Sequence, residues 1–453
     1  MSNSSLLLSP APALATRRQT PRSRWRRPRP SSTLMRLLGI PNRWMLGGIP
    51  FLRRIPFIRD LPLVRGYFRV RRVALPDADR MRLLGAVNPE TVAFLAPNHP
   101  EFATDWLIDK ALSMIAAPRM ASWADREIVS LAPRFWEMNN LVRNDGGADA
   151  KEYSIEWALA GEGVLLHPEG SVRWTNDFVH PLFPGVAQMA IAAAPRTAHP
   201  VYVVPLVWKY QFVGDVSAGL HREMGAIERG LGLTSMDWLS ISQRFRSLQY
   251  GVLAMRMEHF GYRAPLDADF FDRQTAFQHF LLAQLAHYHE PHDERGLASM
   301  VRSIRRARRA LHGDRSAEAD VERRRLDADL ERANEVKRLG ELTRTLYGSE
   351  TLTQEQIFEC LKRTRDRLMR TGWVNRLGVM LPRPAGPRIV HVGVPEPIRV
   401  AYVGPGSTDD YERELLEKTR TAMQDALDAI NRRIAPEVDG HRHANALAAP
   451  AEP

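Results

Sequence analysis

The chain has 453 residues, and its 63 basic and 52 acidic side chains give a formal net charge of +11. Residues 1–59 hold twelve arginines and no acidic residue, so the remainder is close to neutral. Only the arginine-rich N-terminal segment therefore suggests nucleic-acid binding, and we expect no nucleic-acid partner. The single cysteine, Cys360, excludes an intramolecular disulfide and a multi-cysteine zinc site.

The N-terminal residues divide into two segments. Residues 1–32 are rich in Ser, Pro and Arg without hydrophobic periodicity, which predicts a disordered arm. An organellar transit peptide and a true start at Met35 are alternatives. Residues 33–67 mix apolar side chains with arginines, and four prolines cut them into pieces too short to span a bilayer. We expect this segment to lie on an anionic membrane surface, the alternative being that it packs on the protein's own core.

Alternating strands and helices follow, which is the pattern of an α/β sheet. We predict strands at residues 67–74, 91–96, 164–167 and 201–207, and helices at residues 77–84, 105–116, 149–160 and 186–194. These elements define a core over residues 68–214.

Residues 215–385 differ, because helical spacing replaces strand patterns. Aromatic and leucine side chains recur at helical spacing within residues 267–289. Thr353 and Gln356 have the spacing of a capping box that opens a helix. We therefore predict a large helical insert at 215–385.

Strand patterns return at residues 388–393 and 397–400, and a last helix is expected from residue 407 to about residue 433. Residues 386–434 would complete the core, and residues 435–453 are expected to form a disordered tail. The predicted fold is α/β, a mixed sheet flanked by helices and interrupted by the insert.

His99 directly follows the predicted buried strand 91–96. Imidazole has a pKa close to neutral pH and is the usual base for deprotonating an attacking alcohol. A carboxylate can orient such a ring, and Asp105 and Glu101 are both candidates. On a continuous helix, six residues correspond to about 240°, so contact between His99 and Asp105 requires a turn. Pro100 favours that turn because it pushes the preceding residue into extended geometry.

Three further blocks follow in order. Arg143 ends a short apolar stretch, and a guanidinium group matches phosphate oxygens bidentately. Glu169 and Gly170 form a Pro-Glu-Gly turn, where glycine lets backbone amides approach an anion. Pro205 lies inside the valine-rich strand 201–207.

This ordered set resembles the four blocks of the glycerolipid acyltransferases, which acylate glycerol-3-phosphate and lysophospholipids. The resemblance covers about residues 68–210 and, more loosely, 388–433. It implies transfer of a fatty acyl group from acyl-CoA or an acyl carrier protein to a phosphate-bearing lipid acceptor, with His99 as the base and Asp105 as its partner. The substrate-binding residues that it implies are Asn98, Arg143, Glu169, Gly170, Ser171, Arg173 and Pro205.

The chain departs from the family pattern in two places. Five residues instead of four separate His99 from Asp105. In the block that the family writes Phe-Pro-Glu-Gly-Thr-Arg-Ser, His167 replaces Phe, Ser171 replaces Thr, and the arginine is displaced by one position to Arg173. We interpret His167 as a substitute for a packing aromatic ring.

We expect no metal and no cofactor beyond the thioester co-substrate, because the chain has no nucleotide loop and no metal motif. The expected location is the cytoplasm, peripheral to the inner or cytoplasmic membrane. Three alternatives remain open: an enzyme of the same fold with a non-glycerol lipid acceptor, a non-catalytic lipid-binding protein, and a nucleic-acid-binding protein, which only the arginine arm suggests.

Overall fold

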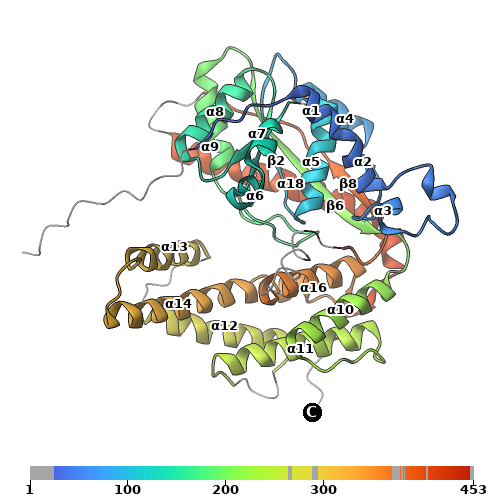
Figure 1. Cartoon of the computed structure of the whole chain (residues 1–453), viewed down its shortest axis with the longest axis vertical. Helices are drawn as coiled ribbons and strands as arrows, with labels where there is room; N and C mark the ends of the chain where they lie inside the picture. The colour runs from blue at the N-terminus through green and yellow to red at the C-terminus, as the bar shows by residue number, and fades with distance from the viewer. Residues whose placement is uncertain are drawn as a thin grey trace, which may run out of the picture.

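The computed structural model describes residues 25–117, 119–263, 268–287, 294–369, 378, 381, 383–402, 404 and 407–448. Within these residues, an eight-stranded sheet has the order β1-β8-β6-β2-β5-β3-β4, with β9 paired to β6 (Figure 1). Its strands are β1 (Val70–Ala74), β2 (Val92–Pro97), β3 (Ala121–Ala124), β4 (Leu141–Arg143), β5 (Val164–Leu165), β6 (Val201–Phe212), β8 (Arg388–Gly393) and β9 (Ile398–Arg399).

The sheet is mixed, as predicted. β2 pairs in parallel with β5 and β6, and β3 pairs in parallel with β5 and β4. β8 runs antiparallel to β6 and parallel to β1. Five neighbouring strands therefore end at one shared carboxyl edge, which is where side chains on the following loops can meet.

Helices cover both faces of the sheet. One face carries α2 (Gly39–Gly47), α4 (Asp77–Ala86) and α5 (Ala103–Ala116), and the other carries α8 (Gly147–Leu159), α9 (Gly185–Ala193) and α18 (Thr408–Asp439) (Figure 1). Strand alternation explains the two cores. Leu206 and Trp208 of β6 pack in the cluster that contains α5, whereas Val203 and Val207 point into the clusters with α9 and α18.

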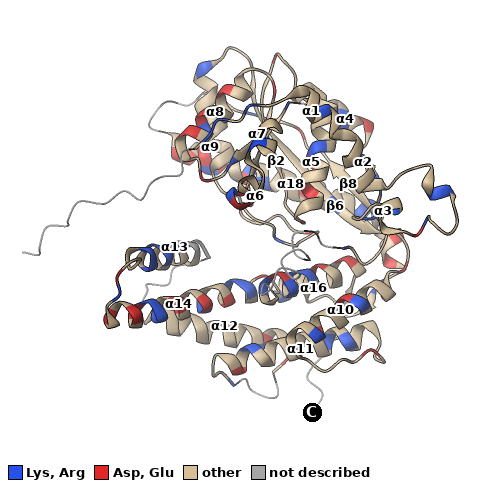
Figure 2. Cartoon of the chain, viewed as in Figure 1, with Lys and Arg blue, Asp and Glu red and all other residues tan. Residues whose placement is uncertain are grey.

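The described residues between β6 and β8 are mainly helical and have a hydrophobic cluster of their own. The helices are α10 (Ser217–Leu231), α11 (Ile241–His259), α12 (Phe270–Ala286), α13 (Glu294–Ala310), α14 (Ala317–Leu339), α15 (Arg344–Tyr347) and α16 (Gln354–Leu368). Both α14 and α16 carry acidic and basic residues along their length (Figure 2). Because β6 and β8 are direct neighbours, the chain leaves the sheet after Phe212 and returns beside it at Arg388.

Helix α16 joins these helices to the sheet. Thr353 and Gln356 form the predicted capping box at its start. Glu355 accepts a hydrogen bond from the Phe212 N–H at 2.6 Å, and Glu359 accepts one from the Asn176 N–H at 2.7 Å. Buried carboxylates that accept backbone donors fix the position of α16 against the end of β6.

Several short elements complete the fold. They are α1 (Ser32–Leu37), the 3₁₀ turns η1 (Leu52–Arg54) and η2 (Ala194–Arg196), α3 (Pro62–Arg65), α6 (Arg126–Leu131), α7 (Pro133–Met138), and the paired strands β7 (Thr351–Leu352) and β10 (His443–Ala444). The two-residue strand β7 lies in a region for which only helices were predicted, and two residues are too few to give a strand pattern.

The predicted disorder does not hold for the described parts of the two ends, residues 25–32 and 435–448. Residues 1–24 and 449–453 lie outside the described residues. The Ser31 N–H donates to the Met138 carbonyl at 2.9 Å, and the Trp25 ring contacts Tyr153, so an aromatic anchor holds residues 25–31. At the other end α18 continues through Pro436 to Asp439, and Leu447 is fully buried.

Candidate functional site

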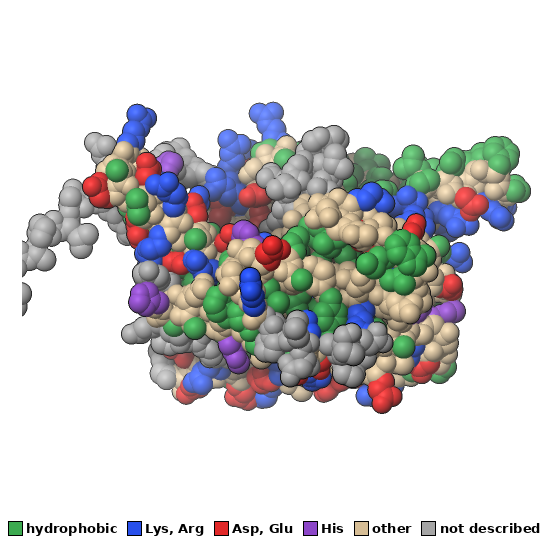
Figure 3. All heavy atoms as spheres, turned by 90° about the horizontal axis from the view of Figure 1, so that it is seen from below, with side chains coloured by type: hydrophobic (Ala, Val, Ile, Leu, Met, Phe, Trp, Pro, Cys, Tyr) green, Lys and Arg blue, Asp and Glu red, His purple; other side chains and the backbone are tan. Residues whose placement is uncertain are grey.

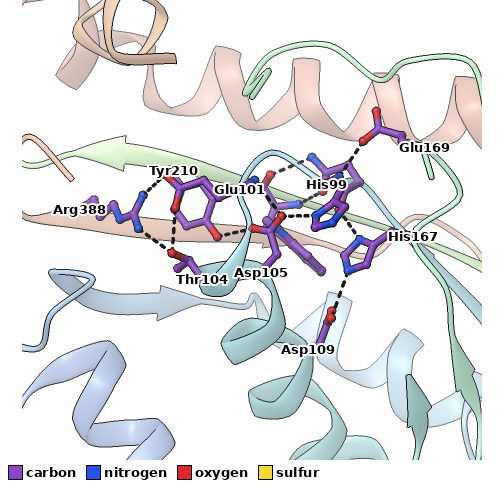
Figure 4. A network of polar contacts seen from close by, with 11 residues as sticks. His99, Glu101, Thr104, Asp105, Asp109, His167, Glu169, Tyr210 and Arg388 are labelled. Atoms are coloured by element: carbon purple, nitrogen blue, oxygen red, sulfur yellow. Dashed lines mark hydrogen bonds and ion pairs between the residues drawn. The ribbon is translucent and has the colours of Figure 1, made fainter. Parts of the chain in front are cut away.

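His99 and Asp105 meet at the carboxyl edge of the sheet. Nδ1 of His99 lies 2.8 Å from Oδ2 of Asp105 (Figure 4). His99 is on the loop after β2, and α5 begins only at Ala103, after Phe102 has turned the chain with φ −89° and ψ −90°. The extra residue is therefore absorbed before the helix starts, and the pair forms as predicted.

Glu101, the alternative partner for His99, is engaged elsewhere. Its carboxylate accepts a hydrogen bond from Arg388 at 2.6 Å and another from the Thr104 hydroxyl at 2.8 Å. Arg388 is fully buried and also lies over the Tyr210 ring. These contacts hold the loop that carries His99 in place. Because they occupy Glu101, Asp105 is the partner of the imidazole.

The Asp105 carboxylate is buried and accepts four hydrogen bonds. Besides the imidazole, its donors are the Glu101 N–H at 2.8 Å, the Trp208 indole at 3.0 Å and the Tyr210 hydroxyl at 2.6 Å. Burial raises the pKa of Asp105 well above its usual value, whereas the nearby His167 and the Tyr210 hydrogen bond oppose that shift. Four donors fix the orientation of the carboxylate and hence of the ring.

Trp208 and Tyr210 reach Asp105 because β6 extends beyond the end of the neighbouring strand β2. The β2–β6 pairing ends at Pro97 opposite Leu206, and β6 continues to Phe212, five residues past its predicted end. Alternation puts Trp208 and Tyr210 on the same face as Leu206. The overhanging strand thus forms one wall of the site.

The second ring nitrogen of His99 faces outward. Among the described residues, none forms a hydrogen bond with Nε2, and the side chain is 17% exposed. Burial, followed by the neighbouring His167, lowers the pKa of His99 well below its usual value. A neutral ring that donates from Nδ1 to a carboxylate has its lone pair on Nε2, where it can accept a proton.

Glu169 holds the His99 loop in place. One carboxylate oxygen accepts the His99 N–H at 2.7 Å (Figure 4). The other accepts the His180 N–H at 2.8 Å. Burial raises the pKa of Glu169, and these two hydrogen bonds oppose the shift. Because both oxygens are occupied and the side chain is buried, the predicted contact of Glu169 with a substrate does not fit this geometry.

The turn after Glu169 requires glycine. Gly170 has φ +71°, and a Cβ atom there would lie 2.6 Å from the Phe183 ring. Gly170 and Ser171 are exposed. The Arg173 N–H donates to the His99 carbonyl at 3.1 Å, and its guanidinium donates to the Glu169 carbonyl at 3.3 Å. Of the predicted substrate contacts, Gly170, Ser171 and Arg173 therefore lie beside His99.

Two other predicted substrate contacts are internal. The Asn98 side chain binds both the N–H and the carbonyl of Trp208, at 2.9 and 3.0 Å, and is buried. Pro205 is buried in the sheet opposite Ala96. Asn98 joins β2 to β6, and Pro205 packs inside the core, so neither is placed to contact a substrate.

Arg143 lies apart from His99. It ends β4, three strand positions from β2, which corresponds to about 14 Å across the sheet. Its guanidinium forms two hydrogen bonds with Asp145, at 2.9 and 2.6 Å. It lines a pocket of about 350 Å³ together with Arg26 and Glu137. An acceptor that contacts both His99 and Arg143 would therefore extend along the carboxyl edge of the sheet from β2 to β4.

The sequence analysis missed Asp109 and Arg388 and gave His167 a different role. His167 stacks on His99 and is bonded to Asp109, so it does not merely replace a packing ring. Asp109 follows Asp105 by four residues on α5, and this spacing already places both carboxylates on one helix face. Arg388 carried no such signal, because its partner Glu101 is 287 positions away in the chain.

Within the described residues, no group of three or more His, Cys, Asp or Glu side chains is arranged to hold a metal ion. A cavity of about 30 Å³ lies behind the His99 loop, between Pro100 and α16. That volume holds about one water molecule.

Comparisons of the chain with models of known protein families, with curated proteins and with solved structures find no match.

Proposed function

We propose that the chain is an O-acyltransferase that moves a fatty acyl group from a thioester to the hydroxyl of a phosphate-bearing lipid acceptor. The observation that carries the proposal is the His99–Asp105 pair, a buried carboxylate held by four donors and an imidazole whose Nε2 is accessible. This is the arrangement that general-base catalysis of alcohol attack requires. Acyl-CoA or an acyl carrier protein would supply the thioester.

In the proposed reaction, His99 Nε2 takes the proton of the acceptor hydroxyl while that oxygen attacks the thioester carbonyl carbon. Asp105 stabilises the imidazolium that forms and keeps Nδ1 protonated. The carbon–oxygen bond forms and the carbon–sulfur bond breaks. The imidazolium then returns its proton to the leaving thiolate, which gives an ester, a free thiol and neutral His99. No covalent acyl-enzyme is needed.

The positions of two arginines give different expectations for the acceptor. Arg173 is attached by its backbone to the His99 loop, so a small acceptor such as glycerol-3-phosphate would meet this cation first. Arg143 ends β4, a strand about 14 Å from β2 across the sheet, so this cation favours a larger headgroup. Arg173→Met should raise KM for a small phosphate acceptor, and Arg143→Met should leave that KM unchanged.

A peripheral membrane location is part of the proposal. Large apolar side chains are exposed throughout residues 37–63, and these are Leu37, Ile40, Trp44, Met45, Phe51, Phe57, Leu61 and Leu63. Figure 3 shows apolar side chains with arginines beside them on the projecting loop that joins α2 to α3. No helix of the described residues is both long and apolar enough to cross a membrane. Such a loop can enter the headgroup region while its arginines meet anionic lipid.

The test is thiol release from acyl-CoA, or from an acyl carrier protein thioester, in the presence of glycerol-3-phosphate and a panel of lysolipids. His99→Ala should lower kcat by about 10²–10⁴-fold, and Asp105→Asn should also lower it strongly. Far-UV circular dichroism and urea midpoints should show that both variants remain folded. His99→Ala turnover equal to that of the native chain would refute the assignment. Lipid binding without turnover by the native chain would favour the non-catalytic alternative.

A further inference from the structure

His167 stacks directly on His99. The ring centroids are 4.0 Å apart and the ring planes differ by 17° (Figure 4). His167 Nδ1 lies 2.9 Å from the Asn98 carbonyl oxygen, and Nε2 lies 3.1 Å from Oδ2 of Asp109. Both partners are acceptors, and a histidine donates from both nitrogens only as the imidazolium. With Asp109 ionised, these contacts are those of an imidazolium.

Asp109 supplies the negative charge that sustains this cation. It lies one helical turn after Asp105 on α5, and its side chain is 4% exposed. Burial alone would lower the pKa of His167, but the charge and hydrogen bond of Asp109, together with Asp105, outweigh burial and raise the pKa of His167 to about 9. Two imidazole–carboxylate pairs thus lie side by side, and only the His99 pair has an accessible ring nitrogen.

We propose that the His167–Asp109 pair is a built-in electrostatic control on His99: the stacked imidazolium disfavours a second positive charge and holds His99 in its basic form at neutral pH. His167 is a positioning residue, because both of its nitrogens are occupied and neither can reach a reacting atom. Its effect on catalysis rests on the proposed function, whereas its effect on the protonation of His99 does not.

The other groups that face the two rings are Asp105 on α5, Trp208 on β6, Glu101 on the loop after β2, and Glu169 and Arg173 on the turn after β5. Trp208 is uncharged and packs against His167 in a T-shaped arrangement. Asp105 favours a charged His99, and Arg173 opposes it. Removing the charge of His167 leaves burial and Arg173 as the influences that oppose a charged His99, so protonation of His99 becomes easier.

The test is a pH titration of histidine ring signals by NMR in the full-length chain, with His99 assigned by loss of its signal in His99→Gln. His167→Phe keeps a stacked ring without charge, and Asp109→Asn keeps the imidazole but removes the group that keeps it charged. Both variants should raise the titration midpoint of His99 by about one pH unit or more, as expected when a nearby like charge is removed. Two independent variants keep the test decisive if one of them does not fold.

His180→Asn is the matched control. Burial, then Arg173, lowers the pKa of His180 to about 3, so this nearby histidine is uncharged over the titration range. Its replacement should leave the His99 midpoint unchanged. A His99 midpoint that is the same in the native chain, His167→Phe and Asp109→Asn would overturn the inference. A native His167 that titrates near 6.5 would overturn it as well.

Thioester turnover separates this inference from the proposed function. If both hold, the acidic limb of kcat/KM should move upward in His167→Phe by the same amount as the His99 midpoint. If the His99 midpoint shifts but the native chain shows no turnover, the proposed effect of His167 on His99 is supported and the proposed function is refuted. If the native chain turns over but the His99 midpoint does not shift in the variants, the proposed effect of His167 is refuted and the proposed function is supported.

Discussion

The Tyr210 hydroxyl donates a 2.6 Å hydrogen bond to Oδ1 of Asp105, although 105 positions separate the two residues. The bond links the overhanging end of β6 to the first turn of α5, directly beneath His99. A hydrogen bond to a buried charged group contributes about 1.5–3 kcal/mol. Tyr210→Phe should therefore lower the free energy of unfolding by about that amount, measured by urea denaturation at pH 7.

The same variant should also reduce kcat if Asp105 orients the base. Trp208→Phe is the comparison, because it removes the other donor to Oδ1 at 3.0 Å. If Tyr210→Phe changes neither stability nor turnover, the hydrogen bond is not part of what holds Asp105 in place.

The buried Arg388–Glu101 ion pair should be costly to break from one side. Arg388→Met leaves the Glu101 carboxylate buried without its cation, for which we expect a loss of about 3–5 kcal/mol in the free energy of unfolding. Glu101→Gln combined with Arg388→Met removes both charges and should recover part of that loss. Additive losses in this double-mutant cycle would show that the two side chains do not interact.

Gly170 should not tolerate a side chain. Gly170→Ala places an L-residue at φ +71°, which costs about 1–2 kcal/mol, and also brings its Cβ within 2.6 Å of the Phe183 ring. Phe183→Ala in the same chain removes the steric clash but not the backbone strain. Urea denaturation should therefore show a smaller effect of Gly170→Ala in the Phe183→Ala background. Equal effects in both backgrounds would mean that the ring moves aside freely.

The His167–Asp109 pair should make stability depend on pH in the alkaline range. The pKa of His167 is raised to about 9, so its stabilising contribution is complete below about 6.5 and disappears as the pH rises through 9. The native chain should lose about 1–3 kcal/mol between pH 6.5 and pH 10 relative to the double variant His167→Phe, Asp109→Asn. Parallel stability curves for the two proteins would contradict this charge assignment.

The exposed loop should govern binding to lipid vesicles. Phe57 is 83% exposed and Leu63 is 79% exposed. Replacing both by Ser should weaken binding to vesicles that contain phosphatidylglycerol by about tenfold or more, since burying one such side chain contributes about 1.5–3 kcal/mol. Trp238→Ser, at a 72% exposed site on the helical segment, is the control and should bind normally. If the native chain, the Phe57 and Leu63 double variant and Trp238→Ser bind equally well, the exposed loop is not the part of the protein that contacts lipid.

The sequence predicted those features that depend on local spacing. Alternating strands and helices placed His99 at the end of β2, and the capping box of α16 was recognised from Thr353 and Gln356. The sequence also predicted that a turn at Pro100 would let His99 contact Asp105 despite the extra residue, because proline pushes the preceding residue into extended geometry.

The features that were missed depend on contacts between distant segments. Glu169 was expected to face a substrate, and only the three-dimensional fold shows its carboxylate bonded to the His99 N–H. Arg388, which bonds to Glu101, comes after the whole helical segment 215–385 in the sequence. Pro436 ends no helix here, because packing of Ile430 and Ile434 in the core outweighs the local preference.

The strand order has a consequence for how the chain reaches its native state. Among the described strands, β1 pairs only with β8, so Val70–Ala74 has no neighbour until Arg388–Gly393 has been synthesised. At 5–20 residues per second the ribosome needs roughly 15–60 s to cover that interval. An unpaired strand edge exposed for so long invites association with other chains. Folding during translation would therefore depend on chaperones more than the size of the sheet suggests.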